Sequence, residues 1–132
     1  MDGPSILHIL AVFTGGAIGG VARFVASSFL DRVSGGDFPW GTLGVNVSGS
    51  ALIGLFAAIF LEDGAAGPAA VTWTFFVIGV LGSYTTVSAF SLQTLVLARA
   101  GRFGAASANV LASLALCLAA AASGFALGAG TF

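Results

Sequence analysis

Residues 79–88 read GVLGSYTTVS and lie in the middle of an apolar segment that runs from residue 69 to residue 97. The segment is longer than the roughly 20 residues that one membrane-spanning helix needs. Glycine and β-branched residues have low helix propensity, so this run continues a helix poorly. Non-helical backbone is tolerated at membrane depth only where protein or a wet cavity surrounds it. We therefore predict a membrane helix that is either kinked at a glycine or broken near its middle.

The rest of the chain has the composition of a bilayer protein. Of its 132 residues, 58% are hydrophobic and 7% are charged, whereas a soluble domain carries about 25% charged residues. Four basic residues and a net charge of −1 exclude a disordered chain and give no basic surface for nucleic acid. We expect one all-α integral membrane domain over residues 1–132, in contact with the lipid bilayer. Its four expected spans cover residues 6–29, 40–61, 69–97 and 103–127.

The basic residues predict an orientation. Arg32, Arg99 and Arg102 fall in the first and third expected loops, and Arg23 lies near the end of the first span, whereas the termini and the second loop hold no Arg or Lys. Positively charged loops stay in the cytoplasm. We therefore expect a multi-pass protein of the cell membrane with both termini outside.

The titratable residues argue against enzymes and proton-driven carriers. No Asp or Glu lies inside an expected span, and the single histidine, His8, lies near a span end. Proton-coupled carriers usually need an intramembrane acid or histidine. Intramembrane hydrolysis would need a nucleophile together with a base. We therefore expect a protein that is not an enzyme.

Uncharged hydrogen-bond donors recur at helical spacing along three spans. Such rows either bond across helices or line a pathway, and three rows in so short a chain favour a pathway. Arg23 either extends to the interface or faces a vestibule, where it would attract an anion. Neutral donors with one arginine suit an anion better than a cation. The rows are Thr42, Asn46 and Ser50; Thr85, Thr86, Ser88, Ser91 and Thr94; and Asn109, Ser113 and Cys117.

Three stretches together resemble the small fluoride channels of the Fluc, or CrcB, family. They are GGAIGGVARF at 15–24, FPWGTLGVNVSGS at 38–50 and GVLGSYTTVSAFS at 79–91. The resemblance implies a four-helix subunit with a broken third helix, paired antiparallel with a second subunit. That subunit is either a copy of the same chain or an oppositely oriented paralogue. The resemblance further implies two fluoride pores per dimer, passive export of cytoplasmic fluoride that protects the cell from its toxicity, and one structural sodium ion (Na+) at the dimer centre.

The resemblance also assigns roles to single residues. Asn46 becomes the pore asparagine, Phe90 the second aromatic of the fluoride path, and Arg23 a vestibule residue. Phenyl edges carry partial positive charge, so they can face an anion. The carbonyls of Gly82 and Thr85 would hold the sodium. The full set implied for the fluoride path is Asn46, Phe90, Ser88, Asn109, Ser113, Thr86 and Arg23.

The sequence departs from the family pattern at three positions. Val87 stands where the family usually has its first Phe, Gln93 where it usually has Glu, and Ala89 where it has Thr. A dimer of this chain alone would therefore lack one aromatic per pore. The one-sided arginines also disfavour insertion in both orientations. We hypothesise that the chain is one half of a heterodimer.

Two other functions remain open. A small four-helix multidrug-type exporter would carry an intramembrane Glu in its first span, and residues 6–29 have none. A non-transporting membrane scaffold subunit would show glycine faces without polar rows and an unbroken third helix.

Overall fold

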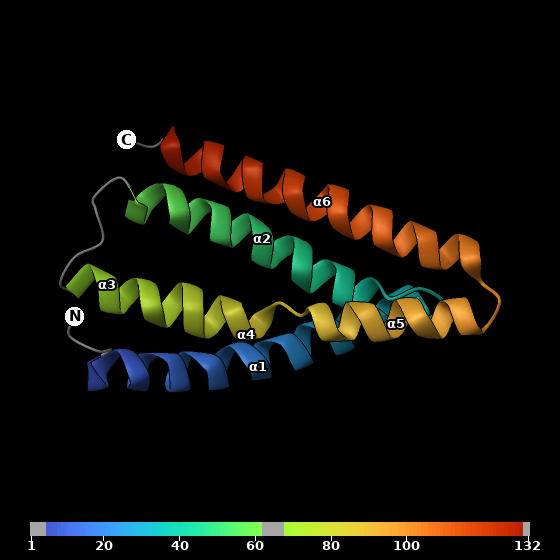
Figure 1. Cartoon of the computed structure of the whole chain (residues 1–132), viewed down its shortest axis with the longest axis horizontal. Helices are drawn as coiled ribbons and strands as arrows, with labels where there is room; N and C mark the ends of the chain where they lie inside the picture. Colours follow the sequence, from blue (N-terminus) through green and yellow to red (C-terminus); the bar gives the residue numbers. More distant parts are fainter. Residues whose placement is uncertain (1–4, 62–67, 131–132) are drawn as a thin grey trace.

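The chain folds into a bundle of long helices (Figure 1). The computed structural model describes residues 5–61 and 68–130; the predicted second loop, which begins at Glu62, and both chain ends lie outside this range. Within the described part, four helical runs are long and apolar enough to cross a membrane, at residues 6–34, 40–60, 69–99 and 103–129. The prediction of an all-α, four-span protein is confirmed. The elements are α1 (Ile6–Ser34), α2 (Trp40–Leu61), α3 (Pro68–Trp73), the π-helix η1 (Thr74–Leu81), α4 (Gly82–Tyr84), α5 (Val87–Arg99) and α6 (Phe103–Ala129).

The first helix is longer than the apolar segment that predicts it. α1 continues through the charged residues to Ser34 and ends at Gly35, whose φ of 86° is a left-handed helix cap. Charged residues are compatible with a helix, so the glycine and not the change in polarity sets the boundary. The extension places the Asp31 carboxylate against the start of α2, where its Oδ1 accepts a hydrogen bond from the Gly41 N–H at 2.7 Å.

Of the two alternatives that the residues leave open, the structure shows the break: the third span is interrupted by extended backbone, as the family resemblance implies, and is not kinked at a glycine. Gly82 has helical angles (φ −62°, ψ −33°). The backbone becomes extended at Thr85 (ψ 158°) and at Thr86 (φ −153°, ψ 124°). Both are β-branched residues, which favour extended conformations. Figure 1 shows the link between α4 and α5 as a short non-helical connection between two helical segments that follow one another.

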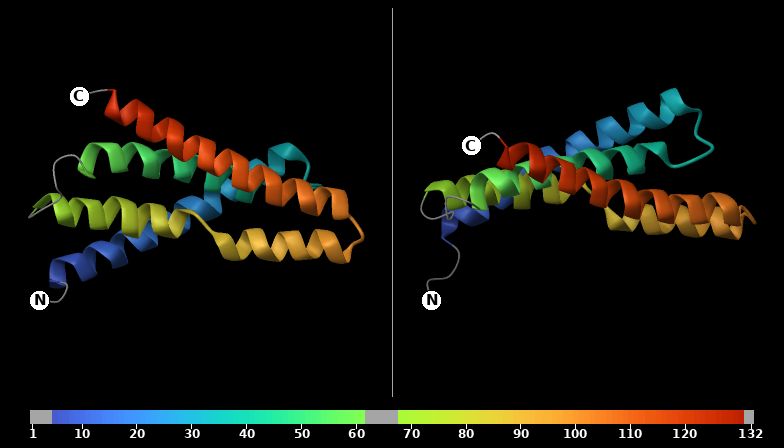
Figure 2. Two further views of the ribbon diagram at one scale, coloured as in Figure 1. Left: turned by 45° about the horizontal axis from the view of Figure 1, so that its top comes forward. Right: turned by 90° about the horizontal axis from the view of Figure 1, so that it is seen from above.

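Glycines allow close backbone contacts between the helices on both sides of the bundle. A methyl group on Gly19 of α1 would overlap the carbonyl oxygen of Val80 in η1, and one on Gly124 of α6 would overlap that of Ala51 in α2. Small residues at such crossings are typical of membrane helices. In the two views of Figure 2, α1 crosses the bundle obliquely, whereas α5 and α6 run side by side.

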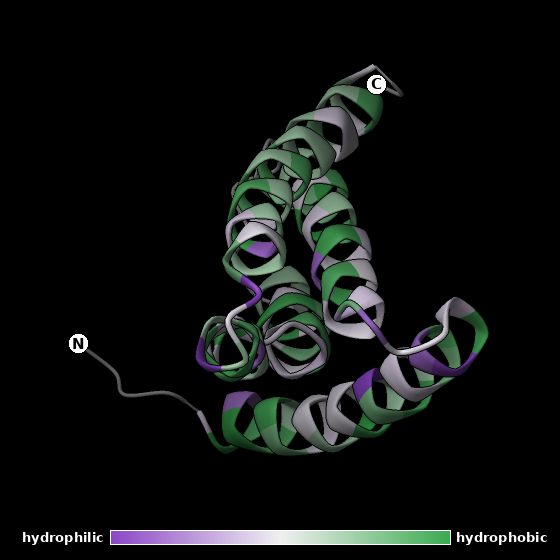
Figure 3. Cartoon of the chain, turned by 90° about the vertical axis from the view of Figure 1, so that its right-hand side faces the viewer, coloured by the Kyte–Doolittle hydropathy of each residue, from purple (hydrophilic) through white to green (hydrophobic). Residues whose placement is uncertain are grey.

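The outer surface is apolar. Phe13 and Leu127 expose more than two thirds of their area, and they are examples of many exposed large hydrophobic side chains. Figure 3 shows hydrophobic residues over most of the helix surfaces, with polar residues concentrated towards the helix ends and the turns. This surface suits the hydrocarbon of a bilayer, where backbone polar groups must be satisfied inside the protein.

Candidate functional site

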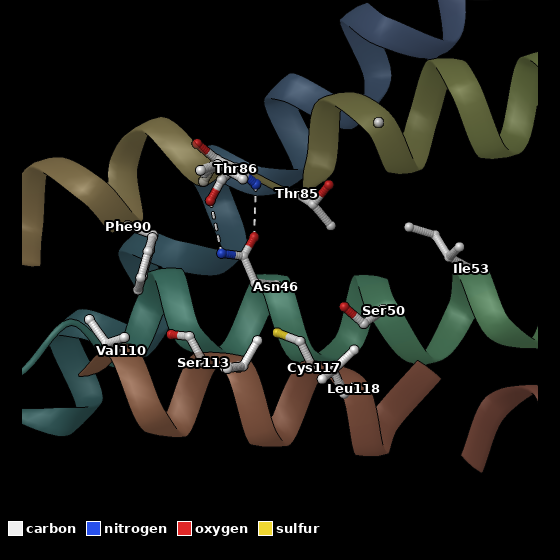
Figure 4. A pocket seen from close by; sticks show the side chains of 13 residues that line it. Asn46, Ser50, Ile53, Thr85, Thr86, Phe90, Val110, Ser113, Cys117 and Leu118 are labelled. Atoms are coloured by element: carbon white, nitrogen blue, oxygen red, sulfur yellow. Dashed lines mark hydrogen bonds between the residues drawn. The ribbon is translucent and has the colours of Figure 1, made fainter. Parts of the chain in front are cut away.

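A cavity of about 660 Å³ lies beside the break. Residues of α2, α4, α5 and α6 and the extended residues between α4 and α5 contribute to it. Figure 4 shows polar and apolar side chains on its walls. Among the described residues, those that line the cavity carry no charge. They are Asn46, Ser50 and Ile53 of α2; Gly82, Thr85 and Thr86 at the break; Val87 and Phe90 of α5; and Val110, Ser113, Leu114, Cys117 and Leu118 of α6.

The side chain of Asn46 holds the broken backbone in place. Its Nδ2 donates a hydrogen bond to the Thr86 carbonyl at 2.9 Å, and its Oδ1 accepts one from the Thr86 N–H at 2.7 Å (Figure 4). The amide therefore pairs with Thr86 in the way that a neighbouring strand would. This pairing matters because an unsatisfied backbone group in hydrocarbon costs several kcal/mol.

Asn46 retains capacity for a ligand after it has bound Thr86. A primary amide carries two N–H donors, and the bond to the Thr86 carbonyl uses one of them. The residue also lines the cavity. One side chain can therefore stabilise the break and offer a neutral donor to a bound anion.

The same pairing releases a carbonyl group at the end of α4. In a continuous α-helix the N–H of Thr86 would bond to the carbonyl of Gly82, but it is directed to Asn46 instead. Three residues further on, the carbonyl of Thr85 accepts a hydrogen bond from Arg23 Nη1 at 3.3 Å. Carbonyl oxygens are the ligands that hard cations prefer. Gly82 and Thr85 thus offer oxygens of the kind that a hard cation binds, but two are fewer than such ions usually collect, and the Thr85 oxygen already accepts from the Arg23 guanidinium.

Arg23 lies in a second, smaller hollow of about 260 Å³ and not in the main cavity. Thr86 belongs to the walls of both, so the break separates the hollow around Arg23 from the cavity around Phe90. Ser27, Thr42 and Gln93 add uncharged polar groups to the hollow, and Asp31 adds a carboxylate. The Oε1 atom of Gln93 is buried without a hydrogen-bond partner among the described residues.

The predicted path residues divide into two groups. Asn46, Thr86, Phe90 and Ser113 meet at the main cavity. The hydroxyl of Ser88 lies 3.0 Å from that of Thr86 and outside the cavity lining, at the first turn of α5.

Asn109 also lies outside the cavity lining, because it faces the interior of the helix pair α5–α6. It is 2% exposed, and its Nδ2 donates to Thr94 Oγ1 at 2.9 Å. A search for polar side chains alone misses the apolar residues of the cavity wall, for example Val110, Leu114 and Leu118. Helical spacing could have identified them, because they lie on the same face of α6 as Ser113.

A membrane helix broken beside a cavity with polar groups on its wall is typical of channels and transporters, and the fold and the cavity place this protein in that class. The family model described as "CrcB-like protein, Camphor Resistance (CrcB)" matches residues 10–125. The chain belongs to this family, as its motifs predict, and it is therefore a multi-pass protein of the cell membrane.

Several curated relatives match most of the chain and are named as ion channels and not as enzymes, in agreement with the prediction from the sequence. "Fluoride-specific ion channel FluC 2" of Bradyrhizobium diazoefficiens is 47% identical over 92% of this chain and 89% of its own length. "Fluoride-specific ion channel FluC" of Paramagnetospirillum magneticum is 49% identical over 86% of this chain and 88% of its own length.

Proposed function

We propose that this protein is a passive, fluoride-selective channel through which cytoplasmic fluoride leaves the cell. The observation that carries the proposal is the position of Asn46 and Phe90 on the walls of one uncharged cavity beside a break in a membrane helix. The names of the relatives, which are fluoride-specific ion channels, supply the identity of the ion.

Selectivity for a small hydrated anion follows from the groups on the cavity wall. A permeating ion must exchange its hydration shell for protein ligands. The free N–H of Asn46 and the hydroxyl of Ser113 are neutral donors that can replace water. The edge of the Phe90 ring adds partial positive charge without a full charge that would trap the ion. Weak sites in series let fluoride enter and leave.

The hollow around Arg23 serves as the vestibule on the side of the α1–α2 turn. Its guanidinium raises the local concentration of anions. The Asp31 carboxylate on the same wall already accepts the Gly41 N–H. An anion that enters here reaches Thr86, the residue shared with the main cavity.

A second subunit completes the channel, with two pores per antiparallel dimer. The carbonyls of Gly82 and Thr85 would hold a sodium ion together with the same groups of the partner, because one chain offers too few oxygens. A bound sodium would supply a fixed positive charge between the subunits. Binding of sodium to the purified protein, followed as a sodium-dependent rise in melting temperature, tests this site.

The partner is an oppositely oriented paralogue in this proposal. Val87 exposes 76% of its area and lies on the cavity wall, where an aromatic side chain from the partner would supply a missing ring edge. Arg32, Arg99 and Arg102 lie at or beside the α1–α2 and α5–α6 turns, at one end of the bundle, which favours a single insertion direction.

Efflux of fluoride from liposomes tests the function. Purified protein should release fluoride down its gradient much faster than chloride, and a proton gradient should leave the fluoride rate unchanged. Equal rates for the two halides would contradict fluoride selectivity, and a rate driven by protons would favour an exporter. If the chain alone releases no fluoride, the assay is repeated with a co-expressed paralogue. Efflux that appears only with the paralogue indicates a missing partner, and no efflux in either case contradicts the proposed function.

A further inference from the structure

Two residues of α5 and the residue that caps its start share a pattern that the proposed path does not explain. Phe90 and Thr94 are four residues apart in α5, so they lie on one face of the helix, and Thr86, four residues before Phe90, caps the start of this helix. Each threonine is held by an asparagine from a different helix, Thr86 by Asn46 of α2 and Thr94 by Asn109 of α6. Phe90 therefore lies one turn from each of two hydrogen-bonded anchors.

The second anchor ends on the backbone of Phe90 itself. Asn109 Nδ2 donates to Thr94 Oγ1 at 2.9 Å, and the Thr94 hydroxyl donates to the Phe90 carbonyl at 2.8 Å. Burial of an unpaired amide would be costly, so the almost fully buried Asn109 has a strong preference for this arrangement. The first bond joins α5 to α6 one turn after Phe90, and the second, inside α5, orients the Thr94 hydroxyl that accepts it.

Few contacts determine the position of α5, so the hydrogen bond between Asn109 and Thr94 has a large share in holding it. The extended residues Thr85 and Thr86 disconnect α5 from the helix before it. After the break, α5 packs mainly on α6 and has little contact with α2. The Asn46 pairing fixes only Thr86, the residue that precedes α5. Eight residues later, about 12 Å along the axis, the Asn109–Thr94 bond fixes the other side of Phe90.

We propose that Asn109 and Thr94 are positioning residues that hold the Phe90 ring in the cavity wall and thereby set the selectivity for fluoride over chloride. This role rests on the proposed function, because it requires Phe90 to face the permeating ion. Asn109 acts through Thr94 and α5 and does not touch the ion.

The Thr94→Val substitution is the first test, because valine keeps the shape of threonine and removes both hydrogen bonds. We expect fluoride efflux from liposomes to fall about tenfold, the factor that corresponds to about 1.4 kcal/mol, and the fluoride-to-chloride ratio to fall with it. Thr94→Ser, which keeps the hydroxyl, should restore both. Thr74→Val is the matched control, because the buried Thr74 hydroxyl makes the same type of bond, to the Ala70 carbonyl at 2.8 Å, far from α6. It should leave both quantities unchanged.

A double-mutant cycle separates positioning from a general loss of structure. Asn109→Ala should lower the selectivity ratio in the native background and have no further effect in a Phe90→Ile background, since the ring that it positions is gone. Independent effects of the two substitutions, or native selectivity in Thr94→Val, would overturn the positioning role while the channel function stands. If wild-type protein released no fluoride even with a paralogue, the proposed function would fail, and this inference with it.

Discussion

Asn46 and Thr86 are 40 residues apart and exchange two hydrogen bonds, of 2.9 and 2.7 Å, between the side-chain amide of one and the backbone of the other. The arrangement needs a donor and an acceptor in one short, planar group. Asparagine offers both, whereas a carboxylate has no donor and a hydroxyl cannot span the two backbone groups at once. A break in a membrane helix is therefore supported by one residue of the helix beside it.

The Asn46→Asp substitution should reduce function, because it keeps the acceptor for the Thr86 N–H and loses both amide donors. An ionised carboxylate would also repel an anion from the cavity. We expect fluoride efflux to fall at least tenfold. The free energy of unfolding in detergent should fall by about 1–3 kcal/mol, the cost of leaving one buried hydrogen-bonding group without a partner. Asn46→Leu should destabilise more, since both Thr86 groups lose their partner. Native melting temperatures for both variants would show that the pairing does not support the break.

Phe90→Ile should slow fluoride efflux, because isoleucine fills a similar space without the partly positive edge of a phenyl ring. We expect a loss of about tenfold or more in liposomes, with a melting temperature close to that of the native protein. Phe13→Ile is the matched control, since Phe13 exposes 74% of its area on the outer surface of α1. A fluoride rate unaffected by Phe90→Ile would move the path away from α5.

Gly19→Ala should destabilise the fold, because its methyl group would overlap the backbone carbonyl of Val80. Backbone cannot move aside as a flexible side chain can, so α1 must separate from η1 at a cost of about 1–3 kcal/mol. Gly104→Ala is the matched control: it lies in a helix with nothing within 4 Å of the added methyl, and alanine there should stabilise by up to about 1 kcal/mol. Thermal unfolding in detergent measures the stability of both variants. Equal shifts of the melting temperature for Gly19→Ala and Gly104→Ala would contradict the close contact between α1 and η1.

Residue types and local spacing predict much of the fold, because membrane spans depend on the apolar content of each segment. The excess length of 69–97 and its glycine and β-branched residues predict an irregularity in the third span, and the family resemblance decides for a break over a kink. The π-helix of Thr74–Leu81 has no comparable local signal, since it forms where η1 packs against the glycine face of α1. The continuation of α1 to Ser34 is missed for a different reason: a loss of hydrophobicity marks the edge of the apolar segment and not the end of a helix.

The site was less predictable, because its key relationships join residues far apart in the sequence. Helical spacing places Asn109 and Ser113 in one row, yet Ser113 lines the cavity and Asn109 bonds to Thr94. Residues four apart on a helix differ by about 40° around its axis. At the edge of a cavity, this difference of angle is enough for Ser113 to line the cavity while Asn109 is buried between helices. The sequence indicates the row but cannot show where the neighbouring helix covers it.

Val87→Phe should raise fluoride efflux when this chain is the only subunit present, because Val87 is largely exposed on the cavity wall and a ring there would add the missing aromatic edge. With an oppositely oriented paralogue that supplies its own aromatic, the same substitution should give little or no increase. Val21→Phe on the exposed surface of α1 is the matched control for added bulk. Liposome efflux with each subunit combination provides the measurement. Full fluoride flux from the native chain alone, unchanged by Val87→Phe, would show that a homodimer is sufficient and that the cavity needs no further ring.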